Sequence, residues 1–198
     1  MLIDFLRHGE TVLPGHLLGH TDAALADAGW VQFERQTERR SFDAVVASPL
    51  KRARLAAEAV AAERGVPFCA DADWSELDFG AWDGRALADL NADEATAAAL
   101  AAIYTSADAA GAPEGESWRD LERRVIRAID RLMAFGADSR VLVSSHAGPM
   151  RAALAVACAM PFEALWAFRI DYGTRLTLRV GRDDGGALWG EVIEIVQP

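Results

Sequence analysis

Short apolar runs alternate along the chain with longer segments in which apolar residues recur every three or four positions. The short runs predict strands and the longer segments predict helices, because side chains repeat every two residues along a strand and about every 3.6 along a helix. The predicted strands are 2–6, 43–47, 66–70 and 141–145, and the predicted helices are 27–40, 49–64, 117–135 and 149–160. This alternation is typical of an α/β fold, here a three-layer sandwich whose mostly parallel sheet is covered by helices on both faces.

Two further segments complete the expected organisation. Residues 175–180 and 188–196 flank a turn rich in Gly and Asp, which predicts a closing hairpin. Residues 85–112 are rich in alanine and predict helices within an inserted lid that spans roughly 76–117. We expect residues 1–198 to form a single domain with this insertion, since no repeat or linker-like tract interrupts the pattern.

Local signals place the ends of several elements. Ser48 is a typical helix N-cap, Pro49 suits the first helical position, and Gly65 is typical of a helix end. Pro67 predicts that the strand at 66–70 lies at an edge of the sheet, because proline cannot donate a ladder hydrogen bond.

Charge and cysteine content narrow the class of protein. The 198 residues carry a formal net charge of −10, which argues against nucleic acid or an anionic membrane surface as partner. The longest uncharged apolar run, 152–162, is too short to cross a membrane, and the N-terminus lacks a signal-peptide pattern. Cys69 and Cys158 lie in apolar runs without metal or redox spacing, so we expect two buried thiols in a soluble, cytoplasmic protein.

Candidate chemistry gathers at the carboxyl ends of the predicted strands, which is where ligands bind in open α/β sheets. Arg7, His8 and Thr11 follow the first strand, and His146 and Ala147 follow the strand at 141–145. Only four histidines occur in the chain, and two of them occupy these strand ends. The coincidence favours a functional pair over two histidines that merely pack in the core or cap a helix.

Three cations, Lys51, Arg52 and Arg54, lie at the start of the helix that follows the second strand. A helix N-terminus carries partial positive charge, so cations there are unfavourable unless an anion lies between them and the helix. Exposure to solvent explains Arg54 well enough, whereas Arg52 points to an anion, and a planar guanidinium suits phosphate. We therefore expect a phosphoryl group between Arg52 and the residues at the other two strand ends, with an imidazole as candidate nucleophile.

Phosphoryl transfer to an imidazole also needs an acid for the leaving oxygen. Glu76 and Asp78 are the candidates, in a loop that is rich in glycine and aromatic residues. Chemistry alone does not choose between the two carboxylates, and each taken singly is equally well explained as a surface side chain.

Five motifs, in order, resemble the signature of the histidine phosphatase (phosphoglycerate-mutase-like) superfamily. They are Arg7-His8-Gly9-Glu10-Thr11, Ser48-Pro49-Leu50-Lys51-Arg52-Ala53, Glu76…Phe79-Gly80…Trp82-Asp83-Gly84, Gly115-Glu116-Ser117 and Ser145-His146-Ala147-Gly148. The first motif alone is a weak signal, but five ordered matches are specific. Within the superfamily, the segments 76–80 and 165–170 are similar to the alpha-ribazole phosphatases of cobalamin assembly.

The resemblance implies a role for each matching residue. His8 is the implied nucleophile, which forms a phosphohistidine, and Glu76 is the implied proton donor to the leaving alcohol and then the base for the attacking water. The implied phosphate-binding groups are Arg7, Arg52, His146, the N–H of Ala147 and the hydroxyl of Thr11. No metal ion and no cofactor is implied. Relatives often carry Asn where this chain has Leu13-Pro14-Gly15, so we expect Thr11 or the backbone there to replace that contact.

The charge of the insertion separates a phosphatase from a phosphoglycerate mutase. No Lys or Arg lies between Arg85 and Arg119, whereas that stretch holds six acidic residues. We expect such a lid to repel a bisphosphate and to accept a monophosphate with a neutral or weakly cationic body. His20, Trp82 and Tyr104 are candidates for the substrate rim, although most aromatic residues of this region are expected in the core.

The expected activity is hydrolysis of alpha-ribazole 5′-phosphate, a small-molecule phosphomonoester, with an acidic-to-neutral pH optimum. A broad-specificity phosphatase for sugar or nucleotide monophosphates is the alternative. A phosphoglycerate mutase or a phosphate-binding module without turnover is disfavoured, the latter because every motif residue for turnover is present. A zinc site is disfavoured because no H-x-H or H-E-x-x-H spacing occurs, and His16, like His20, is expected at the surface or the substrate rim.

Overall fold

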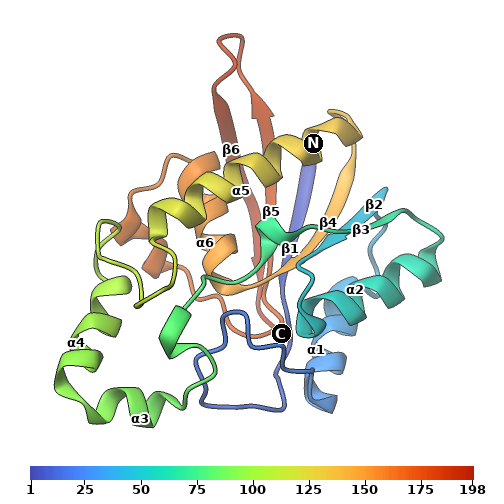
Figure 1. Ribbon diagram of the computed structural model, residues 1–198. Helices are drawn as coiled ribbons and strands as arrows, with labels where there is room; N and C mark the ends of the chain where they lie inside the picture. The colour runs from blue at the N-terminus through green and yellow to red at the C-terminus, as the bar shows by residue number, and fades with distance from the viewer.

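The computed structural model describes residues 1–198 and contains one six-stranded sheet (Figure 1). The strands are β1 (Leu2–Arg7), β2 (Ala44–Ala47), β3 (Phe68–Ala70), β4 (Arg140–Ser145), β5 (Arg175–Arg182) and β6 (Leu188–Val196). They lie in the order β3-β2-β4-β1-β5-β6. The first four are parallel, and the C-terminal hairpin β5–β6 continues the sheet in antiparallel fashion. The predicted α/β sheet and the closing hairpin are therefore confirmed, and β3 lies at an edge as predicted.

Helices cover both faces of the sheet. The α-helices are α1 (Asp27–Thr37), α2 (Lys51–Arg64), α3 (Leu87–Ala92), α4 (Glu94–Ile103), α5 (Trp118–Leu132) and α6 (Ala147–Ala157). Single-turn or short 3₁₀ segments are η1 (Ala72–Trp74), η2 (Gly80–Trp82), η3 (Met133–Phe135) and η4 (Phe162–Ala167). None of the helices combines the length and the apolar character needed to cross a bilayer.

Strand β1 shows how the sequence builds two cores. Its side chains alternate between faces, so Ile3 and Phe5 pack in a large core with α5 and α6, whereas Leu6 packs in a smaller core with α1 and α2. A strand that is covered on both faces reads as a continuous apolar run, which is why the first segment was recognisable as a strand. The three-layer arrangement follows from these two cores.

The structure starts helix α2 two residues later than predicted, and this difference affects the site. Helix α2 begins at Lys51 rather than Pro49, and its N-cap is Leu50 rather than Ser48. The Ser48 hydroxyl instead accepts hydrogen bonds from the Leu50 N–H and from the ring of His146. The prediction of Ser48 as N-cap was wrong because its side chain serves a contact with another strand end.

The cysteines correct a second expectation. Cys69 is exposed because it lies on the short edge strand β3, and Cys158 is half-buried at the end of α6. The prediction of two buried thiols was therefore wrong. Neither cysteine is in a disulfide.

The insertion at 76–117 contains η2, α3 and α4 and lies beside the sheet, at the edge where β1 and β4 end (Figure 1). Its predicted helical character is confirmed. Leu90, Leu100 and Ile103 of this insertion are buried in the large core, so the segment is anchored by apolar contacts. The insertion thus forms one wall above the carboxyl ends of the strands.

Candidate active site

The register of the parallel strands brings the predicted residues together. Arg7 at the end of β1 pairs with Ser145 at the end of β4, and Ala47 at the end of β2 pairs with Ser144. The residues that follow these strands, His8, Ser48 and His146, therefore lie at one edge of the sheet. The rings of His8 and His146 are 5.0 Å apart between centroids.

His8 is held as a neutral imidazole with one free nitrogen. Its side chain is 4% exposed, and Nδ1 lies 2.8 Å from the Gly9 carbonyl oxygen. A carbonyl can only accept, so Nδ1 carries the proton and Nε2 keeps its lone pair. Burial, together with the positive charges of Arg52 and Arg7, holds the pKa of His8 well below its usual range. At neutral pH the ring is therefore uncharged, and its unprotonated Nε2 can act as a nucleophile.

Two glycines fix the loop that carries His8. A Cβ on Gly9 would lie 2.2 Å from the carbonyl oxygen of Gly29 in α1, and a Cβ on Gly29 would lie 2.2 Å from the carbonyl oxygen of Glu10. The backbone of the loop thus packs directly on the first turn of α1, at distances that leave no room for a side chain. The Glu10 N–H also donates to the Gln32 side chain, 2.9 Å away.

His146 is buried behind His8 and uses both ring nitrogens within the protein. Nδ1 accepts from the Arg52 Nε, 3.3 Å away, so the ring proton lies on Nε2 and is donated to the Ser48 hydroxyl, 2.8 Å away. Burial, followed by the positive charge of Arg52, lowers the pKa of His146 well below its usual range. The two histidines are therefore both neutral, and His146 lies beneath the cavity rather than in its wall.

Arg52 is completely buried, as its predicted role requires, but most of its hydrogen bonds are made to the protein. Besides His146, its guanidinium donates to the carbonyls of Leu18, Gly19 and Thr21 at distances of 2.6 to 3.0 Å. Four of its five N–H bonds are thus used within the protein, and Arg52 does not line the cavity above His8. Asp83 holds the same loop by accepting the N–H groups of Gly19 and Thr21.

Lys51 and Arg54, the two cations next to Arg52 on α2, do not need a ligand. Lys51 forms an ion pair with Asp22, whose carboxylate also accepts the Lys51 backbone N–H at the start of α2. Arg54 pairs with Glu58 one turn away. The anion expected at this helix end is therefore supplied by Asp22, and only Arg52 turns inward.

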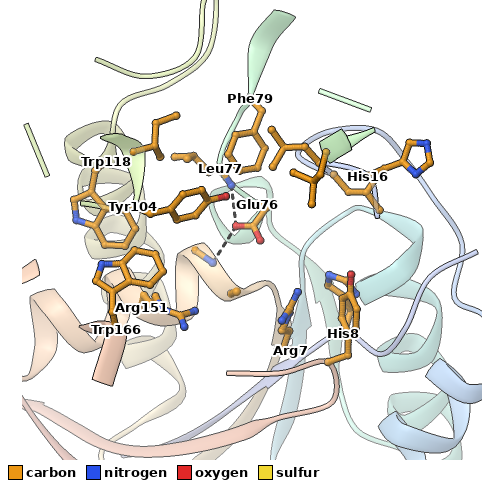
Figure 2. Close-up of a pocket in the computed structure, with 17 residues that line it drawn as sticks. Arg7, His8, His16, Glu76, Leu77, Phe79, Tyr104, Trp118, Arg151 and Trp166 are labelled. Atoms are coloured by element: carbon orange, nitrogen blue, oxygen red, sulfur yellow. Dashed lines mark hydrogen bonds between the residues drawn. The ribbon is translucent and has the colours of Figure 1, made fainter. Parts of the chain in front are cut away.

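The carboxylate of Glu76 is fixed at the first turn of α6. Its Oε1 accepts hydrogen bonds from the backbone N–H groups of Gly148 and Leu77, each at 3.0 Å. The first N–H groups of a helix have no partner within the helix and attract negative charge, which explains this position. Figure 2 shows the second carboxylate oxygen on the side of Arg7 and His8.

Asp78 is turned away from this cavity. It accepts the Gly80 N–H and lies 3.7 Å from His20, and neither Asp78 nor His20 lines the cavity. Of the two carboxylates that the sequence offered, the structure places Glu76 beside His8.

A cavity of about 290 Å³ opens above His8 (Figure 2). One end is polar and contains Arg7, His8, Glu76 and the backbone of Ala147 and Gly148, at the start of α6. The other end is apolar and aromatic. Its lining residues are Leu17, Leu18, Leu77, Phe79, Leu87, Ile103, Tyr104, Trp118 and Trp166. The cavity therefore suits a molecule with a small anionic head and an apolar or aromatic body.

Arg7 is the guanidinium that faces the polar end. Its Nη1 donates to the Ile170 carbonyl, 2.8 Å away, and its guanidinium carbon lies 4.1 Å from the centre of the Tyr172 ring. The Arg7 Nε is buried without a hydrogen-bond partner. A buried N–H without an acceptor is costly, so a bound anion that accepts from it gains binding energy.

Some of the predicted rim and phosphate residues lie elsewhere. Trp82 is buried in the large core and does not line the cavity, because the 3₁₀ turn η2 directs it inward. Thr11 is buried next to α1, and it too lies outside the cavity lining. Tyr104 does line the cavity, as does His16.

The acidic residues of the insertion do not reach the cavity. Glu116 pairs with Arg124 and Asp108 pairs with Arg119, and none of the six acidic residues between Arg85 and Arg119 lines it. The expectation that an acidic lid selects the substrate by charge is therefore wrong. The insertion contributes apolar and aromatic side chains to the cavity instead.

Arg151, Trp166 and Tyr172 line the cavity but were not predicted from the sequence as site residues. Arg151 follows Ala147 by four positions on α6, so helical spacing puts both on one face, and that signal could have been used. Tyr172 comes from the loop before β5, which pairs with β1. Nothing in the local sequence pattern connects that loop with His8.

Comparison with known proteins agrees with this geometry. Residues 3–189 match the family model of the histidine phosphatase superfamily (branch 1). The chain is 34% identical over 178 residues to the adenosylcobalamin/alpha-ribazole phosphatase of Salmonella typhimurium, with 87% of each protein covered. The crystal structure of the alpha-ribazole phosphatase from Shigella flexneri superposes with a TM-score of 0.79 at 28% identity and covers 97% of this chain and 95% of that one.

A mycobacterial glucosyl-3-phosphoglycerate phosphatase has the same fold, with a TM-score of 0.84 over 97% of this chain and 96% of that chain, at 23% identity. The family match spans nearly the whole sequence and includes the ends of β1, β2 and β4, where the site residues lie. The chain therefore belongs to the histidine phosphatase superfamily, branch 1.

Proposed function

We propose that this chain hydrolyses phosphomonoesters through a phosphohistidine on His8 and that its substrate is alpha-ribazole 5′-phosphate. The observation that carries the proposal is the neutral His8 ring with a free Nε2, which lies in the same cavity as the Glu76 carboxylate. Phosphoryl transfer from an ester of an alcohol requires a nucleophile and an acid–base group, and both lie at one end of this cavity.

In the first step the His8 Nε2 lone pair attacks phosphorus, and the bond from phosphorus to the ester oxygen breaks. Protonated Glu76 gives its proton to that oxygen, so a neutral alcohol leaves. The Arg7 guanidinium and the N–H of Ala147 bind the phosphoryl oxygens, and the buried positive charge of Arg52 acts at the same end of the cavity. His146 lies beneath the cavity, where its Nδ1 accepts from the Arg52 Nε and its Nε2 donates to the Ser48 hydroxyl.

In the second step water attacks phosphorus, and the Glu76 carboxylate takes the proton that water loses. The bond from phosphorus to Nε2 breaks, which releases inorganic phosphate and restores neutral His8 and protonated Glu76. General acid–base assistance of this kind contributes about 10²- to 10⁴-fold in rate. Because Glu76 must carry a proton for the first step, we expect an acidic-to-neutral optimum.

The substrate assignment is supported by the relatives and by the shape of the cavity. The Salmonella typhimurium relative is named for alpha-ribazole, and a flat base attached to a sugar phosphate fits a cavity with one polar end and one aromatic end. The apolar wall also favours an alternative, a phosphatase with broad specificity, because apolar contacts discriminate weakly between bodies of similar size.

A panel of substrates tests both readings. We expect kcat/KM for alpha-ribazole 5′-phosphate to exceed the values for ribose 5-phosphate, mononucleotides and 3-phosphoglycerate. A flat profile would leave the reaction class and remove the specific substrate. In acid-quenched samples, His8→Asn should abolish the labelled phosphoenzyme, and a phosphoenzyme that persists in this variant contradicts the role of His8.

We also propose that the reaction needs no metal ion, because guanidinium groups and helix N–H groups supply the positive charge. No three His, Cys, Asp or Glu side chains lie together as metal ligands. The rate should be unchanged after exhaustive dialysis against EDTA, and a loss that Mg²⁺ or Zn²⁺ restores would contradict this point.

A further inference from the structure

Arg151 places a second guanidinium in the cavity, away from the phosphoryl end. Its carbon lies 4.6 Å from the centre of the Trp166 ring, and its Nη2 donates to the Phe168 carbonyl, 3.1 Å away. That is its one hydrogen bond to the protein, and its Nε is buried without a partner. Figure 2 shows the guanidinium between Trp166 and Arg7, below Tyr104.

This position is costly for the empty protein. Burial and the neighbouring positive charge of Arg7 lower the pKa of Arg151, and the nearby Glu76 carboxylate offsets only part of that effect. An apolar side chain of similar size would pack against Trp166 without burying N–H groups that have no acceptor. The unused N–H groups of Arg151 are therefore best explained by an acceptor that a ligand brings.

Tyr104 faces the same space from the insertion. Its ring stands edge-on to Trp166 with centroids 5.4 Å apart, and its hydroxyl points toward Glu76 without a hydrogen bond in the protein (Figure 2). Burial and the Glu76 carboxylate raise the pKa of Tyr104 to about 12, so the hydroxyl keeps its proton. Arg151 and Tyr104 thus offer donors to a ligand group that lies beyond the phosphate.

We propose that Arg151 determines specificity by binding oxygen acceptors on the leaving group, between the phosphate at His8 and the aromatic end of the cavity. This inference rests on the function proposed above. It implies that the groups of the substrate follow one another along the cavity as phosphate, then an oxygen-rich unit, then a flat apolar body. The vicinal hydroxyls of a pentose fit that middle position, and a carboxylate is the other acceptor that a guanidinium binds well.

Matched substrates separate these chemistries. Adenosine 5′-monophosphate and its 2′,3′-dideoxy analogue differ only in the vicinal hydroxyls. The pair of 3-phosphoglycerate and propane-1,2-diol 1-phosphate differs in the carboxylate, which a methyl group replaces, and phenyl phosphate carries neither vicinal hydroxyls nor a carboxylate. We would measure kcat/KM for all five in the wild type, Arg151→Met, Arg151→Lys and Arg123→Met, together with inhibition by inorganic phosphate. Arg123 is an exposed arginine of α5 outside the cavity and serves as the matched control.

The wild type should prefer the acceptor-bearing member of at least one pair by about ten- to a hundredfold, the range for hydrogen bonds to a charged group. Arg151→Met should remove that preference, Arg151→Lys should restore part of it, and phenyl phosphate turnover and inhibition by phosphate should stay unchanged. The pair that shows the preference identifies the acceptor as hydroxyls or a carboxylate.

Two results would overturn the inference. One is an equal loss for all five substrates in Arg151→Met, which would indicate a phosphate-binding or purely structural role. The other is the absence of a preference in either pair in the wild type. If the wild type hydrolyses none of the five substrates, the proposed phosphatase function fails instead, and the preference is then measured as binding of the same pairs by calorimetry.

Discussion

Replacing Gly148 by alanine moves the carboxylate of Glu76 without removing it. A Cβ built on Gly148 lies 2.3 Å from Glu76 Oε1, whereas ordinary contact begins at 3.4 Å. The oxygen must therefore shift by at least about 1 Å, and a misplacement of that size at a reacting group costs up to about a hundredfold in rate. Because the displaced atom ends a flexible side chain, the backbone need not move.

The fold should tolerate this change. Alanine within a helix is more favourable than glycine by about 1 kcal/mol, which offsets the loss of one hydrogen bond from the Gly148 N–H to Glu76. We expect the free energy of unfolding in urea to stay within about 1 kcal/mol of the wild type. Gly185→Ala, in the exposed turn between β5 and β6, is the matched control and should change neither stability nor rate.

The assay compares two leaving groups. A misplaced acid should slow hydrolysis of an alkyl phosphate, whose alkoxide leaves only with a proton, by about 10²-fold. It should hardly lower kcat/KM for p-nitrophenyl phosphate, because the phenolate leaves unprotonated at neutral pH and kcat/KM does not depend on the later attack of water. Glu76→Gln should show the same selectivity in kcat/KM. An equal loss on both substrates in Gly148→Ala, or full activity on the alkyl phosphate, would refute the assignment of Glu76 as the acid.

Three further predictions follow from buried charges. Asp4 is fully buried and accepts hydrogen bonds from two nitrogens of Arg140. Asp4→Ala should therefore lower the free energy of unfolding in urea by about 3–5 kcal/mol, with Asp4→Asn as control. A loss below about 1 kcal/mol would contradict this prediction. Because burial keeps His8 and His146 neutral in the folded state, the unfolded chain binds protons that the folded chain does not. As the pH is lowered from about 6.5, the free energy of unfolding should therefore decrease by about 1.4 kcal/mol per pH unit for each histidine. His8→Asn should reduce that slope, and an unchanged slope contradicts the neutral state of His8. Arg52→Met should raise the pKa of His8 and move the acidic limb of the kcat/KM profile to higher pH, whereas a limb that stays in place would show that the charge of Arg52 does not contribute to that pKa.

The element order and the polar end of the cavity could be predicted from the sequence because each depends on local pattern. Strand β1 is a short, nearly continuous apolar run, helix α5 has strong helical periodicity, and the Ser117 cap of α5 forms as a capping box. Parallel strands bring their carboxyl ends together, so the positions of His8 and His146 followed from the strand assignments alone.

What failed depended on contacts between distant segments. Ser48 has the chemistry of an N-cap, yet its hydroxyl bonds His146, which lies 98 positions later. Trp82 and Trp166 are equally aromatic, but only the tertiary fold puts the first in the core and the second in the cavity. Charge counting along the insertion also failed, since its acidic side chains pair with α5 or point to solvent.

The contact between Gly9 and Gly29 has a consequence for timing. Because the two backbones touch, the nucleophile loop has no alternative position that it could occupy before substrate arrives. Whatever slow rearrangement limits turnover must therefore occur in segments without such a contact, and α4 is one of them because Leu100 and Ile103 hold it to the core through their side chains. In stopped-flow experiments, the burst of phosphoenzyme should be fast for every substrate, whereas release of the alcohol should limit turnover and vary from one substrate to the next.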